Sequence, residues 1–476
     1  MVRHFRTVLI FVHILLLAIV MVSCVKFPDR DRIRNGTEGI LPIYAYSYKD
    51  EVKDLVAEIV IQTDGRVNTN LIETEIPPLK FNKSWLFMLT QDDCRHDAFS
   101  STWASINGKP LSQKYFYDIS HLLAGDLPPD VISIGKTFGS TDGTGNEVRF
   151  SFTTTVAPQW QWMDAKSEVK KLEAVNLYRF FMKTGLIWSN LVEMLNFGTS
   201  IAFHDVNTKS VNNPDSILYH YNIAQSIINN KLSGRVCKVL AEPNGNKTYI
   251  AAANNYAPIR IMTAQAGAET LYPYKVSSEL NRNIIGRGFY SPIQVKDEVE
   301  KVLALPKFER PAIHVGVHGS GIDWSNLLLW LNNSYGKDGA DNVWMTSLEE
   351  YFEYNNYRIR GTVGKVITGN TIRLLINLPM EPNSYYPSIT INVKGLTKEN
   401  ITSLTSSAAI TGLSYGNYDT GLMINIDFRK FLSQLATHYV ERYEKNKNSH
   451  NLSDARYFVA KLKESEVKKT LQNRLK

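Results

Sequence analysis

The stretch that decides the fold is Trp85-Leu86-Phe87-Met88-Leu89-Thr90-Gln91-Asp92-Asp93-Cys94. It is an apolar run followed at once by two adjacent carboxylates. A short continuous apolar run is typical of a strand buried on both faces, as in parallel sheets. Enzymes with α/β barrels carry their functional side chains where such strands end. The stretch therefore predicts a buried strand with Asp92 and Asp93 at its carboxyl end.

Apolar strands and amphipathic helices alternate from residue 85 to about residue 354. Such alternation predicts an α/β domain with a mostly parallel sheet, which we place at residues 83–357. The expected strands are Trp85–Thr90, Phe150–Val156, Ser200–His204, Cys237–Ala241, Ile259–Thr263 and Ile313–His318. The clearest expected helices are Leu186–Asn196, Asp215–Leu232 and Asp323–Tyr335.

The segments on either side of this domain differ in pattern. Residues 24–82 are expected to form a lead-in with some β structure. Residues 358–430 contain short strand patterns separated by Gly, Asn and Pro turns, which predicts a small β-sandwich-like module. Residues 431–476 are expected to form one basic helix.

The amino-terminal segment has the features of a secretory signal. Arg3 and Arg6 precede the apolar run Val8–Val22, which is too short for a typical membrane-spanning helix and is followed by Ser23 and Cys24. This end resembles a bacterial lipobox, in which the cysteine becomes lipidated. We therefore expect a signal peptide over residues 1–23 and an extracytoplasmic protein anchored to a bacterial membrane through Cys24, at the outer membrane or cell surface. An uncleaved anchor or a plain signal peptide is the alternative.

The net charge of +7 does not indicate a nucleic-acid partner. Residues 429–476 hold 12 basic and 5 acidic residues, whereas residues 24–428 hold 39 basic and 41 acidic residues. The excess therefore lies in the tail, and the main body lacks the basic stripe of a nucleic-acid-binding protein. We expect the basic tail to be a solvated helix face. Cys94 and Cys237 have neither CxxC nor metal-site spacing and are expected to be buried free thiols.

Further polar residues follow the expected strands. Taken singly, an Asp-Asp pair is more often a turn or helix cap than a catalytic pair. A lone histidine is more often structural than a metal ligand or a catalytic residue. The candidates beyond Asp92 and Asp93 are His204, the turn Pro243-Asn244-Gly245, His314 and His318.

The order of these residues resembles that of the polysaccharide deacetylase (NodB-homology) family, over roughly residues 84–356. The resemblance implies an irregular (β/α) barrel that removes acetyl groups from glycans with one divalent metal, usually zinc. Thr90-Gln91-Asp92-Asp93-Cys94 is similar to the family's Thr-Phe-Asp-Asp-Gly, which implies that Asp92 is the general base and Asp93 a metal ligand. His204 matches a second ligand, Asn244 the oxyanion turn and His318 the general acid.

The chain departs from the family pattern in two places. The second histidine of the His-x-x-x-His motif is replaced by Thr208, and the arginine and aspartate of the fourth motif are not recognisable between residues 260 and 300. Catalytic zinc usually has three protein ligands, and here the resemblance supplies two. The third could be Asp205, Asn207, His220, His96 or His121, the last two in an enlarged segment, 95–146.

These observations support an extracytoplasmic, lipid-anchored, metal-dependent deacetylase acting on a glycan or oligosaccharide. The alternatives are a non-catalytic glycan-binding protein on a degenerate barrel and a different hydrolase on the same barrel. The deacetylase hypothesis requires that Asp93 and His204 can share one ion. His318 is expected to stand apart from this ion, and it would be the missing third ligand if it converged on the same ion. Because every candidate ligand precedes residue 319, we also expect the carboxyl-terminal segments to be dispensable for metal binding.

Overall fold

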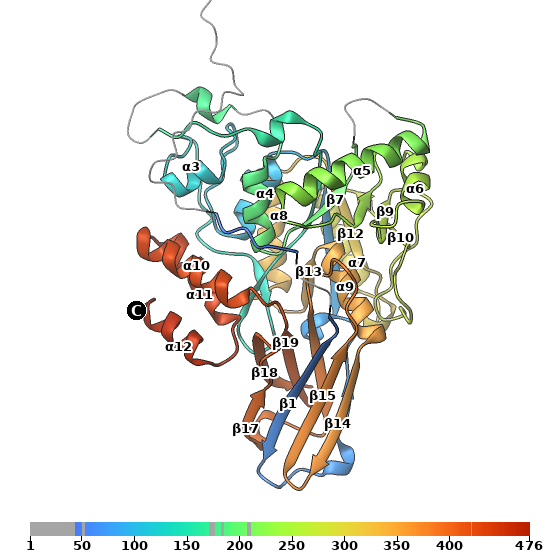
Figure 1. Cartoon of the computed structure of the whole chain (residues 1–476), viewed down its shortest axis with the longest axis vertical. Coiled ribbons are helices and arrows are strands. Elements are labelled where there is room, and N and C mark those ends of the chain that lie inside the picture. Colours follow the sequence, from blue (N-terminus) through green and yellow to red (C-terminus); the bar gives the residue numbers. More distant parts are fainter. Residues whose placement is uncertain (1–42, 50–52, 171–176, 182–184, 207–210, 420) are drawn as a thin grey trace, which may run out of the picture.

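The computed structural model describes residues 43–49, 53–170, 177–181, 185–206, 211–419 and 421–476. The expected signal peptide and Cys24 lie outside these ranges. Within them, no helix is long and apolar enough to cross a membrane. A broad α/β region continues into a tapered β domain, and the carboxyl-terminal helices pack beside their junction (Figure 1).

The α/β region is built around a parallel sheet that closes almost completely into a barrel. Neighbouring strands in the order β10-β9-β8-β7-β6-β3-β12-β11 are hydrogen-bonded, and β13 pairs with β3. This arrangement confirms the expected barrel. Its strands are β3 (Trp85–Gln91), β6 (Thr153–Val156), β7 (Ser200–Phe203), β8 (Val239–Ala241), β9 (Ile261–Ala264), β10 (Ile284–Gly286), β11 (Gly288–Phe289), β12 (Ile313–Val317) and β13 (Val343–Thr346).

One short segment closes the barrel. On one side β10 pairs with β9, and on the other side β11 pairs with β12. Only Arg287 separates β10 from β11 along the chain. Arg287 is therefore held at the joint between the two edges of the sheet.

Strand β3 lies at the centre of the sheet, and all of its residues are buried. Alternate side chains along a strand point to opposite faces. Accordingly Trp85, Phe87 and Leu89 pack in one apolar cluster, while Leu86 and Met88 pack in a second. Burial on both faces explains why its sequence is a continuous apolar run.

The helices between the strands begin at recognisable caps. Asn213 caps α5, Ser291 forms a capping box with Gln294 at α7, and Ser347 caps α9. The enlarged segment 95–146 holds the helical turn η3 (Ala98–Trp103), α2 (Ala104–Ile106), α3 (Ile119–Ala124) and strand β4 (Gly139–Thr141), which pairs with β5 (Glu147–Arg149). The remaining helices of this region are α4 (Trp188–Asn196), α5 (Pro214–Lys231), α6 (Lys247–Asn254), α7 (Pro292–Leu303), α8 (Ile322–Tyr335) and α9 (Leu348–Arg360).

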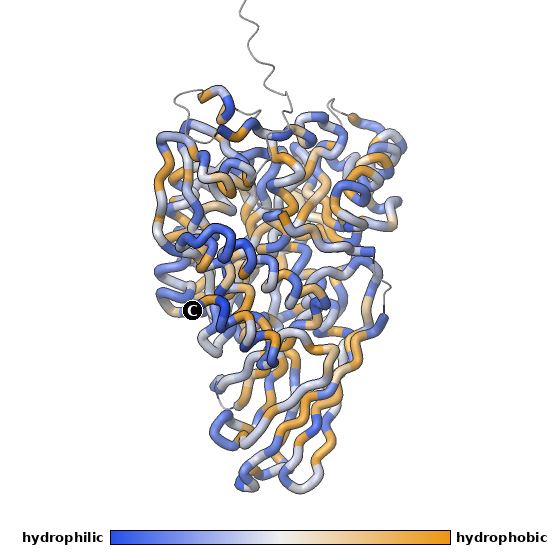
Figure 2. The backbone as a smooth tube through the Cα atoms, turned by 60° about the vertical axis from the view of Figure 1, so that its left-hand side comes forward, coloured by the Kyte–Doolittle hydropathy of each residue, from blue (hydrophilic) through white to orange (hydrophobic). Residues whose placement is uncertain are grey.

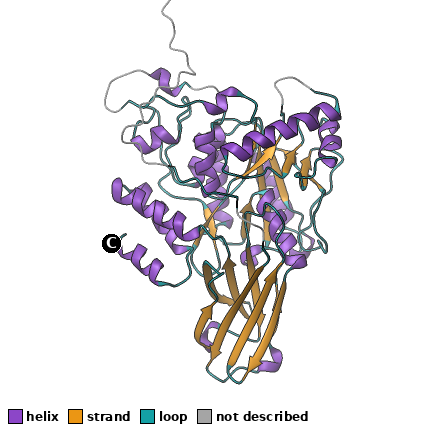
Figure 3. Ribbon diagram, in the orientation of Figure 1, coloured by secondary structure: helices purple, strands orange, loops and turns teal. Residues whose placement is uncertain are grey.

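Two four-stranded antiparallel sheets form the β domain (Figure 3). The lead-in segment contributes a strand to each, since β1 pairs with β15 and β17, and β2 pairs with β16. Buried and partly exposed residues alternate along β1, and apolar and polar colours are mixed along the strands of the β domain in Figure 2. The first sheet contains β14 (Thr362–Thr368), β15 (Thr371–Leu378), β1 (Leu55–Thr63) and β17 (Ile401–Ser406). The second contains β18 (Gly412–Tyr418), β19 (Gly421–Asp427), β16 (Ser388–Lys394) and β2 (Glu73–Glu75).

The carboxyl-terminal segment differs from the single solvated helix expected from its charge. It forms α10 (Leu432–Lys445), α11 (Ser449–Ala460) and α12 (Glu466–Asn473). Tyr439 and Phe458 are buried in the same apolar cluster as Trp85. Arg442 forms a buried ion pair with Glu193 of α4, at 2.5 Å. The tail is therefore part of the barrel's packing, and its dispensability for metal binding stays a prediction.

Candidate functional site

A sharp turn after β3 separates the two adjacent aspartates. Asp93 and Cys94 both have left-handed backbone angles, with φ of 63° and 48°, which non-glycine residues adopt only uncommonly. As a result Asp92 is only 1% exposed, whereas the Asp93 side chain is 45% exposed. The turn thus directs one carboxylate into the protein and the other toward the open carboxyl edge of the barrel.

His204 faces Asp93 across this edge. It directly follows β7, is buried, and its Nδ1 lies 2.8 Å from the carbonyl oxygen of Ala241. A carbonyl oxygen only accepts, so Nδ1 donates to it, and Nε2 either carries a second proton in the imidazolium form or presents its lone pair in the neutral ring. That Nε2 lies 3.5 Å from Asp93 Oδ1. Backbone hydrogen bonds of this kind orient metal-ligating histidines.

The pair Asp93 and His204 fits a shared metal ion. Ligands at 2.0–2.2 Å from a tetrahedral zinc are about 3.3–3.6 Å apart, and the observed separation of 3.5 Å falls in this range. No group of three His, Cys, Asp or Glu side chains suited to a metal occurs among the described residues. Two candidate ligands therefore lie at a suitable separation, and a third is not found in the described part of the chain.

The residues considered as a third ligand have other surroundings. Asn207, like Thr208, lies outside the described residues. Asp205 accepts a hydrogen bond from the Tyr249 hydroxyl at 2.9 Å. The Nδ1 of His220 lies 2.8 Å from Gln159 Oε1. His96 and His121 are fully buried among partners of their own segment, the carbonyl of Tyr117 and the carboxylate of Asp118 respectively.

Charge favours the ionised form of Asp93. Its hydrogen bond with His204 lowers the pKa of the carboxyl group, and the charges of His204, His318 and Arg95 lower it further. For His204, burial opposes protonation, but the charge of Asp92 and the hydrogen bond to Asp93 outweigh it and raise the pKa of the imidazole. A metal-ligating histidine must be neutral, so a divalent cation bound here would replace the proton that Asp92 and Asp93 favour on His204.

Asp92 is held by an arginine that the sequence did not reveal. Arg287 Nη1 lies 2.7 Å from Asp92 Oδ1, and Nη2 donates to the carbonyl oxygen of Glu242 at 2.8 Å. Both side chains of the ion pair are buried. One feature of the sequence could have pointed to this arginine: it lies between Gly286 and Gly288 in an otherwise apolar stretch. Arg287 thus fixes Asp92 beside the pair formed by Asp93 and His204.

We expect the substitution Arg287→Ala to destabilise the fold by about 3–5 kcal/mol, because it leaves the Asp92 charge buried without its partner. Urea unfolding followed by tryptophan fluorescence measures the change. Arg474→Ala is the control, since its 2.7 Å pair with Glu444 is exposed and should contribute less than about 1 kcal/mol. Equal, small effects of the two substitutions would show that the buried pair has no special role in stability.

His318 and Asn244 lie at the ends of two other barrel strands. His318 follows β12, is exposed, and stacks on Phe289 with ring centres 4.8 Å apart. Asn244 follows β8, is exposed, and has a φ of 51°. In the described part of the chain no acceptor contacts its backbone N–H. The structure therefore gathers all five predicted residues at one edge, while their roles remain predictions.

His314, also on β12, belongs to the barrel interior. Its Nε2 lies 2.8 Å from Thr90 Oγ1 and its Nδ1 3.4 Å from Thr263 Oγ1. Burial, with a smaller contribution from the charge of Arg287, lowers the pKa of His314 to about 3. This histidine is a neutral structural side chain.

The His314 pKa predicts acid sensitivity of the fold. Its pKa is about 3 in the folded protein and about 6.5 in the unfolded chain, so the unfolded chain binds more protons between these values. Stability should therefore fall as the pH drops from about 6.5 toward 3, by up to about 1.4 kcal/mol per pH unit. His314→Gln should flatten this dependence, measured by urea unfolding between about pH 7 and pH 4. An unchanged slope would contradict the assignment.

The two described cysteines are buried free thiols, as expected. Burial raises the pKa of Cys94 to about 12, so it stays protonated and is a poor nucleophile. Cys94 instead contributes its backbone, because its N–H donates to Thr155 Oγ1 at 2.9 Å. This bond holds the turn that separates Asp92 from Asp93.

The chain matches a known protein family. A family model described as "Putative polysaccharide deacetylase" matches residues 57–476. The match extends beyond the barrel, since it begins in β1 and includes the carboxyl-terminal helices. No curated protein sequence matches the chain.

Proposed function

Since this chain belongs to the polysaccharide deacetylase family, we propose that it is a metal-dependent glycan deacetylase held on the outer face of a bacterial membrane. The observation that carries the proposal is the arrangement of Asp93, His204 and the buried pair Asp92–Arg287 at one edge of the barrel. Such a set provides separate groups for holding a cation and for moving a proton.

Asp93 and His204 would hold the metal, and a bound divalent ion, zinc being the usual one, would activate water and polarise the acetyl carbonyl. Asp92 is the general base that accepts the proton of the attacking water. Arg287 keeps the base in place, since it bonds both Asp92 and the backbone of Glu242. The exposed N–H of Asn244 would donate to the developing oxyanion.

His318 is the general acid in this proposal. It is exposed at the end of β12 and close enough for its charge to affect Asp93. It would give a proton to the nitrogen or oxygen that leaves the acetyl carbon, so that acetate and the free amine or hydroxyl are released. Its stacking on Phe289 would hold the imidazole ring against the wall of the site.

The proposed location rests on the amino-terminal sequence. Removal of residues 1–23 and lipidation of Cys24 would anchor the protein by its amino terminus. Cys24→Ala should then release it from the membrane fraction of the expressing bacterium, as read by immunoblotting, whereas Cys237→Ala should remain membrane-bound. A membrane-bound Cys24→Ala protein would favour an uncleaved amino-terminal anchor.

Acetate release tests the proposed activity. The purified protein, supplied with zinc, should release acetate from an acetylated chitin oligosaccharide or from acetylated xylan. A protein that binds such glycans and takes up no metal would instead be a glycan-binding protein. Only two ligands are found in the described part of the chain, which is the observation that favours this second function.

A further inference from the structure

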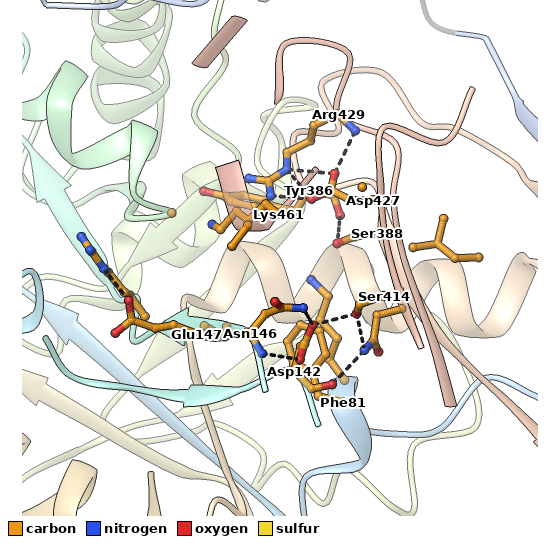
Figure 4. Close-up of a pocket in the computed structure, with 18 of the residues that line it drawn as sticks. Phe81, Asp142, Asn146, Glu147, Tyr386, Ser388, Ser414, Asp427, Arg429 and Lys461 are labelled. Atoms are coloured by element: carbon orange, nitrogen blue, oxygen red, sulfur yellow. Dashed lines mark hydrogen bonds and ion pairs between the residues drawn. The ribbon is translucent and has the colours of Figure 1, made fainter. Parts of the chain in front are cut away.

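A cavity of about 120 Å³ lies where the barrel, the β domain and the carboxyl-terminal helices meet (Figure 4). Its wall includes Ser151 and Gly198, which shortly precede β6 and β7. The cavity is therefore at the amino-terminal edge of the barrel, opposite the edge that carries Asp93 and His204. It takes no part in the proposed deacetylation.

The acidic groups in the cavity wall already have partners. Three of them form ion pairs with cations of the same wall, and these pairs are Glu350 with Lys80 at 2.7 Å, Glu147 with Arg149 at 3.2 Å and Asp427 with Arg429 at 2.5 Å. The fourth acid, Asp142, accepts hydrogen bonds from Ser414 Oγ at 2.7 Å and Asn146 Nδ2 at 2.9 Å. Each of the four acidic side chains therefore has a hydrogen-bond or ion-pair partner other than the remaining cation of the wall.

That remaining cation is Lys461, at the end of α11. Among the described residues its amine forms no ion pair or hydrogen bond. It lies over the rings of Tyr457, at 4.0 Å, and Phe458, at 5.5 Å. Burial, and then the charge of Arg429, lowers the pKa of Lys461 well below its usual value. The residue is half-buried, and the charges of Asp427 and Glu350 only partly offset these effects. An amine held in such a place without a direct anionic partner is costly, and a bound anion would reduce this cost.

Other residues of the cavity wall are apolar and would pack against a hydrocarbon chain. Its apolar members come from all three parts of the protein and include Phe81, Phe197, Ile389, Leu413, Ile426 and Ala460. An apolar cavity of about 150 Å³ binds a molecule as small as benzene. The cavity volume therefore suits an acid of about four to six carbon atoms better than a sugar ring.

We propose that this cavity binds a short-chain carboxylate, whose acid group pairs with Lys461 and whose hydrocarbon chain packs against the apolar wall. Binding there would join the barrel, the β domain and the tail through one ligand. The carboxylate of the ligand would be the anionic partner of Lys461 that no acidic side chain of the wall provides.

Isothermal titration of the purified full-length protein with butyrate tests the proposal. Butyrate should bind at least roughly tenfold more tightly than butyramide, because only the acid can form a charge-assisted bond. Lys461→Met should lose this preference, and Lys469→Met, which removes an exposed amine, should retain it. If Lys461→Met binds butyrate as well as the unaltered protein, or if the unaltered protein binds none, the proposal is wrong.

A second variant and a second anion sharpen the test. Ala460→Leu keeps the amine but places a larger side chain in the wall, so it should also abolish butyrate binding while Lys461 is retained. Inorganic phosphate should bind more weakly than butyrate, because it gains nothing from the apolar wall. Equal binding of phosphate and butyrate would overturn the proposed role of the hydrocarbon chain.

Discussion

Asp93→Ala and His204→Ala should each leave the purified protein without stoichiometric metal. Removing either residue takes away one of the two proposed ligands, whose Nε2 and Oδ1 atoms lie 3.5 Å apart. Metal affinity should fall by more than the roughly 100-fold seen when an outer partner of a ligand is lost. Elemental analysis after dialysis measures the effect, with circular dichroism as the check on folding.

His318→Ala is the matched control for these two variants. It removes an imidazole from the same edge of the barrel, but the general-acid role predicts that the metal remains and only turnover falls. Metal loss equal to that of His204→Ala would make His318 the third ligand. Stoichiometric metal in Asp93→Ala would place the ion elsewhere in the protein.

Asp92→Asn should keep the metal and lower turnover by roughly 100-fold or more, as expected when a general base is removed. Asparagine retains an oxygen that can accept from Arg287, but it leaves the buried arginine charge uncompensated, so circular dichroism is used to confirm that the variant is folded. Acetate release measures turnover, and the metal content of the same samples separates the two effects. Asp164→Asn, at an exposed carboxylate, should leave both unchanged.

Loss of metal from Asp92→Asn would change the role assigned to Asp92. If Asp92→Asn loses metal to the same extent as Asp93→Ala, the two carboxylates hold the ion together. The buried pair with Arg287 would then orient a ligand, and the base would have to be sought among the other residues of this edge.

The barrel was largely predictable because its strands are buried runs with clear ends. The run Trp85–Thr90 became β3, and helix Asp215–Leu232 became α5 within one residue at each end. Arg287 was not predictable in the same way. It lies between strands of three and two residues, which are too short to show a period, and its role depends on barrel closure.

Two other features depended on contacts between distant segments. The pairing of β1 with β15 and β17 joins residues hundreds of positions apart, so residues 24–82 gave only a weak indication of β structure. In the tail, net charge concealed the buried face that carries Tyr439 and Phe458. Charge counts alone do not distinguish a solvated helix from one whose cations form buried pairs, as Arg442 does with Glu193.

The candidate site was predictable at the level of strand ends. The order of Asp92–Asp93, His204, Asn244 and His318 along the chain placed them all at one edge, because parallel strands share a carboxyl edge. Their separations depended on local backbone geometry, such as the left-handed φ of Asp93. No sequence pattern encodes that angle for a non-glycine residue.

The most direct test of the central claim measures metal content and acetate release on one preparation of the purified protein. We predict about one divalent metal per chain, as for a single catalytic site, and acetate release from an acetylated glycan that disappears in Asp93→Ala. A protein that binds the glycan but contains no metal and releases no acetate, even with zinc supplied, would contradict the deacetylase assignment.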